Sequence, residues 1–228
     1  MRLFLPLIAL SLLAGCASAQ MQLPAGLAPG SRIEFTGFTG WNHGRFTAGP
    51  YAGEYERSAD RTVFLDAFKT QSARAKFSVA GPEIGSTIEA RCRMRERSID
   101  TGLVEVLTRP MAYRCEFTAE GRPFPARFEL QEAQSDVLTP YERRGEIALG
   151  GETVQIRSVH HIEGTRMPTL APIGYAFSQD GRPVGAVELN GKPVLILPAG
   201  TDPGLARTLT IAALALGVLY DPANGTDS

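Results

Sequence analysis

Few side chains in this sequence are grouped in a way that could carry out chemistry. The histidines are His43, His160 and His161, and the last two are adjacent. Adjacent side chains on a strand point to opposite faces, so this pair cannot readily bind one metal ion. We predict no metal site. We also predict no cofactor, because the sequence has neither a phosphate-binding glycine loop nor a dinucleotide-binding fingerprint.

Acidic residues give no clear sign of catalysis either. The sequence has no nucleophile elbow and no metalloprotease helix motif. Four carboxylates are scattered over segments that alternate like strands, where a solvated outer face is the ordinary interpretation: Glu83, Glu89, Glu105 and Glu116. We therefore predict a noncatalytic protein with no catalytic residue. An unrecognised enzyme would instead require His160, Glu163 and Arg157 to converge in a cleft with shifted pKa values.

One stripe of charge is conspicuous. Arg91, Arg93, Arg95 and Arg97 occupy every second position, which places them on a single face of a strand. They could contact an anionic surface such as lipid phosphate or lipopolysaccharide, or form a solvated exterior balanced by nearby glutamates. The formal net charge of -1 gives no reason to expect nucleic acid as a partner.

The N-terminus has the layout of an export signal. Residues 1–15 combine a positive start with a short apolar stretch, and they end in a lipoprotein cleavage box, Leu13-Ala14-Gly15-Cys16. We predict that Cys16 is acylated and holds the protein to a membrane. Ala17 fits outer-membrane sorting by its likeness to that lipoprotein class, so the expected location is the bacterial outer membrane, facing the periplasm. The alternative is a simple secretory peptide cleaved after Ala19.

The two remaining cysteines, Cys92 and Cys115, would then lie in an oxidising compartment. Each falls on the apolar side of an alternating segment, so both are expected to point inward from neighbouring strands. We predict a disulfide between them, which would stabilise the fold by roughly 3 to 4 kcal/mol in the chain-entropy model. Two buried free thiols are the alternative.

The rest of the chain divides simply. Residues 16–30 contain several prolines and glycines and suggest a tether, residues 31–222 a single β-rich domain, and residues 223–228 a tail. Turn signals separate short alternating segments: 32–39, 62–68, 73–79, 87–95, 113–118, 126–131, 145–149 and 153–160. A glycine-rich stretch, Trp41–Phe46, suggests a loop that forms either a contact surface or a plug. This order favours an antiparallel meander over βαβ units.

The C-terminal third predicts a hairpin, a third strand and one helix. The hairpin runs from Gly174 to Leu189, and Asn190-Gly191 turns the chain into the next strand. A helix over residues 202–220 begins at Asp202-Pro203 and is apolar on every face. It falls short of the roughly 20 residues that span a bilayer, so we predict a helix enclosed by sheet. Insertion of this helix into a membrane is the alternative.

This C-terminal region resembles the tubby-like family, which includes LURP-one-related and scramblase-type proteins. The residues that carry the resemblance run from Gly174 to Glu188 and from Leu197 through Asp202 to Leu219. The resemblance implies a mainly β fold: a closed antiparallel barrel of roughly twelve strands around a single hydrophobic C-terminal helix. No residue here matches a phosphoinositide or calcium motif of that family, so those functions are not expected.

The resulting functional prediction is a noncatalytic envelope lipoprotein with a structural or binding role. Its partners would be the membrane, through the lipid anchor, and another envelope protein or a lipid. A second hypothesis is a lipid or lipoprotein carrier with a hollow barrel, which would need a cavity of several hundred cubic ångströms. The unrecognised enzyme is the third.

Overall fold

The computed structural model describes residues 20–28, 30–38, 42–64, 68–100, 105–133 and 141–219. The predicted signal sequence, the acylation site at Cys16 and the tail at 223–228 lie outside the described residues.

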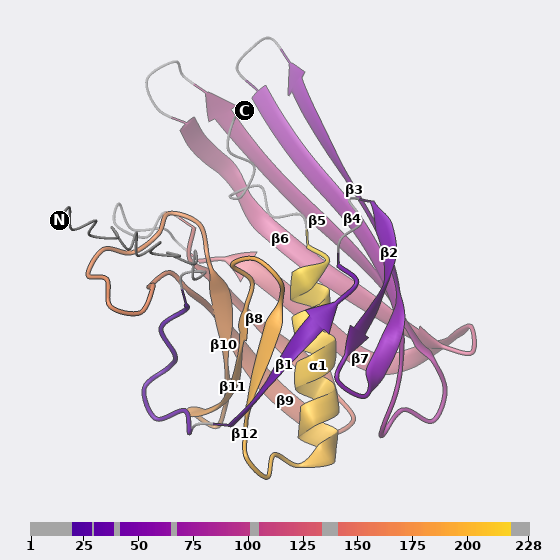
Figure 1. The fold of residues 1–228 in the computed structure, drawn as a ribbon. Coiled ribbons are helices and arrows are strands. Elements are labelled where there is room, and N and C mark those ends of the chain that lie inside the picture. The colour runs from indigo at the N-terminus through magenta and orange to yellow at the C-terminus, as the bar shows by residue number, and fades with distance from the viewer. Residues whose placement is uncertain are drawn as a thin grey trace, which may run out of the picture.

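The described residues form a closed antiparallel barrel of twelve strands followed by one helix, which confirms the predicted fold class (Figure 1). Each strand pairs with its neighbours in sequence, and β1 closes the barrel against β12. The strands are β1 (Gly30–Thr36), β2 (His43–Ala48), β3 (Tyr51–Phe64), β4 (Phe68–Ala80), β5 (Ile88–Asp100), β6 (Glu105–Ala119), β7 (Arg122–Glu132), β8 (Arg143–Leu149), β9 (Glu152–Val159), β10 (Gly174–Gln179), β11 (Arg182–Glu188) and β12 (Val194–Pro198).

Period-two alternation sets the two faces of the wall, because successive side chains on a strand point to opposite sides. On β5, Ala90, Cys92 and Met94 are at most 2% exposed and pack inside. The residues between them are charged and exposed. Strands β3 to β6 have 13 to 15 residues, whereas β8 to β12 have 5 to 8. The long strands therefore extend well beyond the helix at one end of the barrel (Figure 1).

The helix α1 (Pro203–Gly217) lies inside the barrel, where it contacts β4, β8, β9 and β12. It begins at Asp202, whose carboxylate accepts hydrogen bonds from the backbone N–H groups of Gly204 and Leu205. From Thr208 to Leu216 every residue is buried. The surrounding sheet therefore buries the apolar residues on every side of the helix, as expected from the sequence.

No helix in the described part of the chain is long and apolar enough to cross a membrane.

Several boundaries differ from the sequence-based expectation. The segment 62–68 is not one strand, because β3 ends at Phe64 and β4 begins at Phe68, with these two residues paired across a hairpin. Residues 43–46 of the expected loop belong to β2, while Trp41 lies outside the described residues. The helix ends at Gly217 rather than at 220.

The sequence did not predict β2 and most of β3, because charged residues are frequent in both strands and Gly53 and Arg57 interrupt the apolar alternation of β3. At Gly53 a Cβ atom would collide with the carbonyl oxygen of Ser78 on β4 and press on the ring of Phe46. The absence of a side chain at this position is therefore a packing requirement of the barrel wall.

The packed chain begins earlier than residue 31. Met21 is 2% exposed and forms an isolated bridge with Ile162, and its backbone N–H donates to the Glu188 carboxylate at 3.1 Å. Residues 20–28 of the predicted tether therefore include a segment that is bonded to the barrel. The glycine and proline content of this stretch could not reveal such contacts.

Candidate anion-binding face

The outer surface of β5 presents arginines at regular intervals. Arg91, Arg93 and Arg95 are exposed, and their inward-facing neighbours Cys92 and Met94 are buried. Arg97, the fourth member of the predicted stripe, is exposed as well. The alternation in the sequence thus located these side chains on the outside of the barrel.

Strand register adds cations from both neighbouring strands. Arg93 lies directly opposite Arg74 of β4 and directly opposite Arg114 of β6, which makes a row of three arginines across the sheet. Arg91 lies opposite Lys76 in the adjacent row. We call these six residues the arginine face: Arg74, Lys76, Arg91, Arg93, Arg95 and Arg114. Like charges placed directly opposite on a sheet are destabilising, so a bound anion would stabilise this row.

Ion pairs with acidic side chains lie at the rim of this face, while Glu116 of β6 lies directly opposite Arg91 in the strand register. Arg114 approaches Glu129 at 3.7 Å, and Lys76 approaches Glu56 at 3.9 Å. Within the described part of the chain, the central residues Arg74, Arg91, Arg93 and Arg95 form no ion pair. The predicted balance by nearby glutamates is therefore partial.

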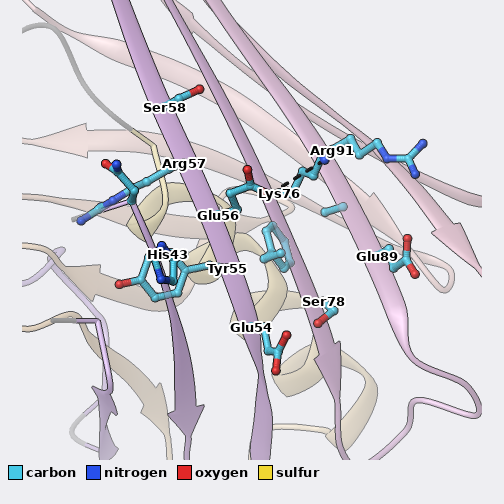
Figure 2. A pocket seen from close by; sticks show the side chains of 13 residues that line it. His43, Glu54, Tyr55, Glu56, Arg57, Ser58, Lys76, Ser78, Glu89 and Arg91 are labelled. Atoms are coloured by element: carbon cyan, nitrogen blue, oxygen red, sulfur yellow. Dashed lines mark ion pairs between the residues drawn. The ribbon is translucent and has the colours of Figure 1, made fainter. Parts of the chain in front are cut away.

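The arginine face is hollowed as well as charged. Five of its residues, with Ser72, line a groove of about 460 Å³ between β4 and β5. A second groove of about 730 Å³ continues from it, since Lys76 and Arg91 line both. Figure 2 shows the second groove, where Glu54 and Glu56 come from β3 and Glu89 comes from β5, with β4 between them. The sheet thus changes from cationic at Arg93 to mixed charge at the second groove.

Sequence reasoning missed several buried polar residues inside the barrel. Arg143 on β8 forms an ion pair with Glu132 on β7 at 2.9 Å, with side chains 0% and 2% exposed. Glu96 and Ser98 on β5 are also buried, at 4% and 3%. The signal was present in the alternation, because Glu96 continues the inward positions of Cys92 and Met94.

The residues of the enzyme hypothesis do not converge. Arg157 is exposed and pairs with Glu142 at 3.3 Å, and Glu163 is exposed on the loop after β9. His160 is buried, with its Nδ1 3.0 Å from the carbonyl oxygen of Thr169 and its Nε2 3.1 Å from Ser158 Oγ.

The roles in this contact follow from the carbonyl. The carbonyl oxygen of Thr169 can only accept a hydrogen bond, so Nδ1 of His160 donates to it and Nε2 of His160 accepts from the Ser158 hydroxyl. Ser158 Oγ in turn accepts from the backbone N–H of Arg143 at 2.9 Å. Burial is the main cause that lowers the pKa of His160 below its ordinary value, which keeps the ring neutral. This network joins β8, β9 and the following loop, and its groups satisfy one another.

The remaining predicted residues are placed as follows. Cys92 and Cys115 lie opposite each other on β5 and β6, are 1% and 4% exposed, and are joined by a disulfide bond. His43 lies on β2 and lines the second groove, whereas His160 is buried and His161 is exposed. Among the described residues no group of three or more His, Cys, Asp or Glu side chains could hold a metal ion.

No protein-family model, curated protein or solved structure matches the chain. The predicted tubby-like relationship therefore stays a prediction, and functional inference depends on the geometry described above.

Proposed function

We propose that this protein is a noncatalytic, lipid-anchored protein of the bacterial envelope that binds phosphate-bearing lipid headgroups with its arginine face. The observation that carries the proposal is the row Arg74, Arg93 and Arg114, three like charges placed side by side by strand register. A phosphate bound among them would supply the missing negative charge. The location and the anchor depend on the cleavage box at Cys16.

The arginine face lies on the outside of the barrel, which favours binding at the surface over transport of an enclosed ligand. The helix α1 lies in the interior and is buried from Thr208 to Leu216. Where the helix runs, the described structure leaves no room for a lipid of several hundred cubic ångströms. The grooves of 460 and 730 Å³ lie on the sheet formed by β3, β4 and β5 instead.

The test measures binding of short-chain phosphatidylglycerol and phosphatidylcholine to the full chain purified from envelopes in mild detergent. We expect phosphatidylglycerol to bind at least tenfold more tightly, because the choline headgroup cancels the phosphate charge. Each Arg93→Gln or Arg91→Gln substitution should weaken binding about fivefold, since one basic residue near an anionic surface contributes about 1 kcal/mol. Affinity should also fall as salt rises.

Arg122 provides the matched control, because it is an exposed arginine at the start of β7. The arginine face lies beside the other end of this strand, where Glu129 is opposite Arg114. Arg122→Gln should leave binding unchanged. Equal affinity for the two lipids, or equal loss in R93Q and R122Q, would contradict the proposal. Full competition by inorganic phosphate at the same concentration would assign the face to free phosphate instead of a lipid headgroup. Purified lipopolysaccharide, tested in parallel, distinguishes a glycolipid phosphate from a phospholipid phosphate.

A further inference from the structure

The large exposed apolar side chains of the described structure lie on two segments that are bonded to each other. They are Leu23 at 37% exposed, Met167 at 81% and Leu170 at 69%. Leu23 belongs to the N-terminal segment, and the other two belong to the loop between β9 and β10. We call these three residues the apolar edge.

The two segments that carry the apolar edge are joined to each other by backbone hydrogen bonds. Gln22 N–H donates to the carbonyl oxygen of His161 at 2.8 Å, and Glu163 N–H donates to that of Gln20 at 2.9 Å. The Met21 side chain packs between them and the barrel, in a cluster with Ile173 and Ala186. The segment is therefore held beside the loop rather than free of it.

A second set of contacts holds the loop in shape. Thr169 donates to the carbonyl oxygen of His160 from its N–H at 2.7 Å and from its hydroxyl at 2.9 Å. Thr165 donates to the carbonyl oxygen of Ile162 in the same two ways, at 3.0 and 2.9 Å. These bonds fix the loop backbone while Met167 and Leu170 stay in solvent. Exposed apolar side chains held on a hydrogen-bonded loop are available for contact with an apolar partner surface.

The predicted anchor identifies that partner. Cys16 precedes Gln20 by four residues, and four residues span at most about 14 Å even when fully extended. Because Gln20 is bonded to Glu163, an acylated Cys16 would keep the loop within about that distance of the lipid surface. No free tether of useful length would separate the two.

We infer that the apolar edge rests in the headgroup region of the anchoring bilayer and sets the orientation of the barrel on it. This inference rests on the proposed acylation of Cys16. The edge lies by β9 and β10, and the arginine face lies on β4, β5 and β6, with at least two strands between them in either direction round the barrel. The arginine face and the apolar edge are thus separate surfaces of the barrel.

The test places an environment-sensitive fluorophore at residue 167 by Met167→Cys, in the full chain inserted into vesicles of phosphatidylethanolamine and phosphatidylglycerol. The chain has three cysteines, so acylation of Cys16 and the disulfide between Cys92 and Cys115 leave the introduced thiol as the single reactive one. Arg122→Cys carries the same fluorophore at the opposite end of the barrel as the matched control. Intact mass of each sample reports the modification of Cys16 independently.

We expect the probe at 167 to shift to the blue and to be quenched at least twofold more than the probe at 122 by lipids with a nitroxide headgroup. Equal, water-like emission at both positions with Cys16 acylated would overturn the inference and leave the anchor standing. A blue shift at 167 that grows with protein concentration in the absence of lipid would assign the edge to a second copy of the chain, which also overturns it. An unmodified Cys16 would remove the anchor and the inference together.

Discussion

The hydroxyl of Tyr113 on β6 donates a hydrogen bond to the backbone carbonyl oxygen of Ala215 in the last turn of α1, at 2.9 Å. The last carbonyls of a helix have no partner within the helix, so they must be satisfied from outside. Arg57 lies near the same end, with Nη1 3.5 Å from the carbonyl oxygen of Gly217. A positive charge at this end also complements the helix dipole. The barrel wall thus fixes the C-terminal end of its central helix with side chains from two strands.

Removing this contact should destabilise the fold. Tyr113→Phe keeps the buried ring and leaves the carbonyl of Ala215 without its partner. We expect the free energy of unfolding to fall by about 1 to 3 kcal/mol, the cost of an unsatisfied buried polar group. Urea denaturation followed by circular dichroism measures it. A change below about 0.3 kcal/mol would mean that the hydrogen bond contributes nothing net.

The same residue should make stability sensitive to alkaline pH. Burial raises the pKa of Tyr113 well above its ordinary value near 10. The folded state therefore holds this proton more tightly than the unfolded state does, so stability is fully present below pH 10 and declines as pH rises above it. We expect the free energy of unfolding to drop between pH 10 and 11.5 in the wild type. Y113F should show a smaller drop, and an identical drop in both proteins would exclude Tyr113 as a source.

The buried ion pair between Arg143 and Glu132 should respond very differently to single and double substitution. Removing one partner leaves an uncompensated buried charge, so Arg143→Met or Glu132→Leu alone should lower the free energy of unfolding by about 3 to 5 kcal/mol. The double variant should recover most of that loss, because no charge remains in the barrel from this pair. Denaturation of all four proteins completes the cycle. Additive effects of the two substitutions would show that the pair does not act as a unit.

Sequence reasoning recovered most of the wall and the central helix because both depend on local patterns. Alternation identified the inward cysteines and the outward arginines, and all-round apolarity identified an enclosed helix. The row Arg74, Arg93 and Arg114 could not be predicted, since it depends on the register of three strands. Alternation along one strand does not determine which residue lies opposite on the next.

The ion pair between Glu132 and Arg143 and the fastened N-terminal segment were missed for a related reason. Glu132 and Arg143 become partners only when β7 and β8 pair, and in sequence they look like ordinary surface charges. The segment around Met21 is short and rich in proline and glycine, yet it bonds to residues some 140 positions later in the chain, as the bridge from Met21 to Ile162 shows. Contacts between residues so far apart leave no local pattern to read.

His160 should make the fold sensitive to acid. Its pKa is lowered, chiefly by burial, so the unfolded state binds this proton more readily than the folded state. The contribution is fully present above the unfolded value near 6.5 and is lost as pH falls below it, by at most about 1.4 kcal/mol per pH unit. Unfolding free energies at pH 7.5, 6 and 5 measure the slope. His160→Gln should flatten the slope, whereas substitution of the exposed neighbour, His161→Gln, should leave it as in the wild type.

The disulfide links two directly paired strands, so its reduction should destabilise the barrel without changing the order of the strands. Cys92 and Cys115 are separated by 23 residues, and closing a loop of that size should contribute about 3 kcal/mol in the chain-entropy model. The variant with Cys92→Ala and Cys115→Ala should lose this amount plus a further cost for the small cavity left in the core. Denaturation of wild type with and without a thiol reductant separates the two contributions. If reductant has no effect on the wild type while free thiols are absent under native conditions, the bond is inaccessible and the measurement must be made from the unfolded state. Equal stability of oxidised and reduced wild type refolded from denaturant would contradict a stabilising role for the bond.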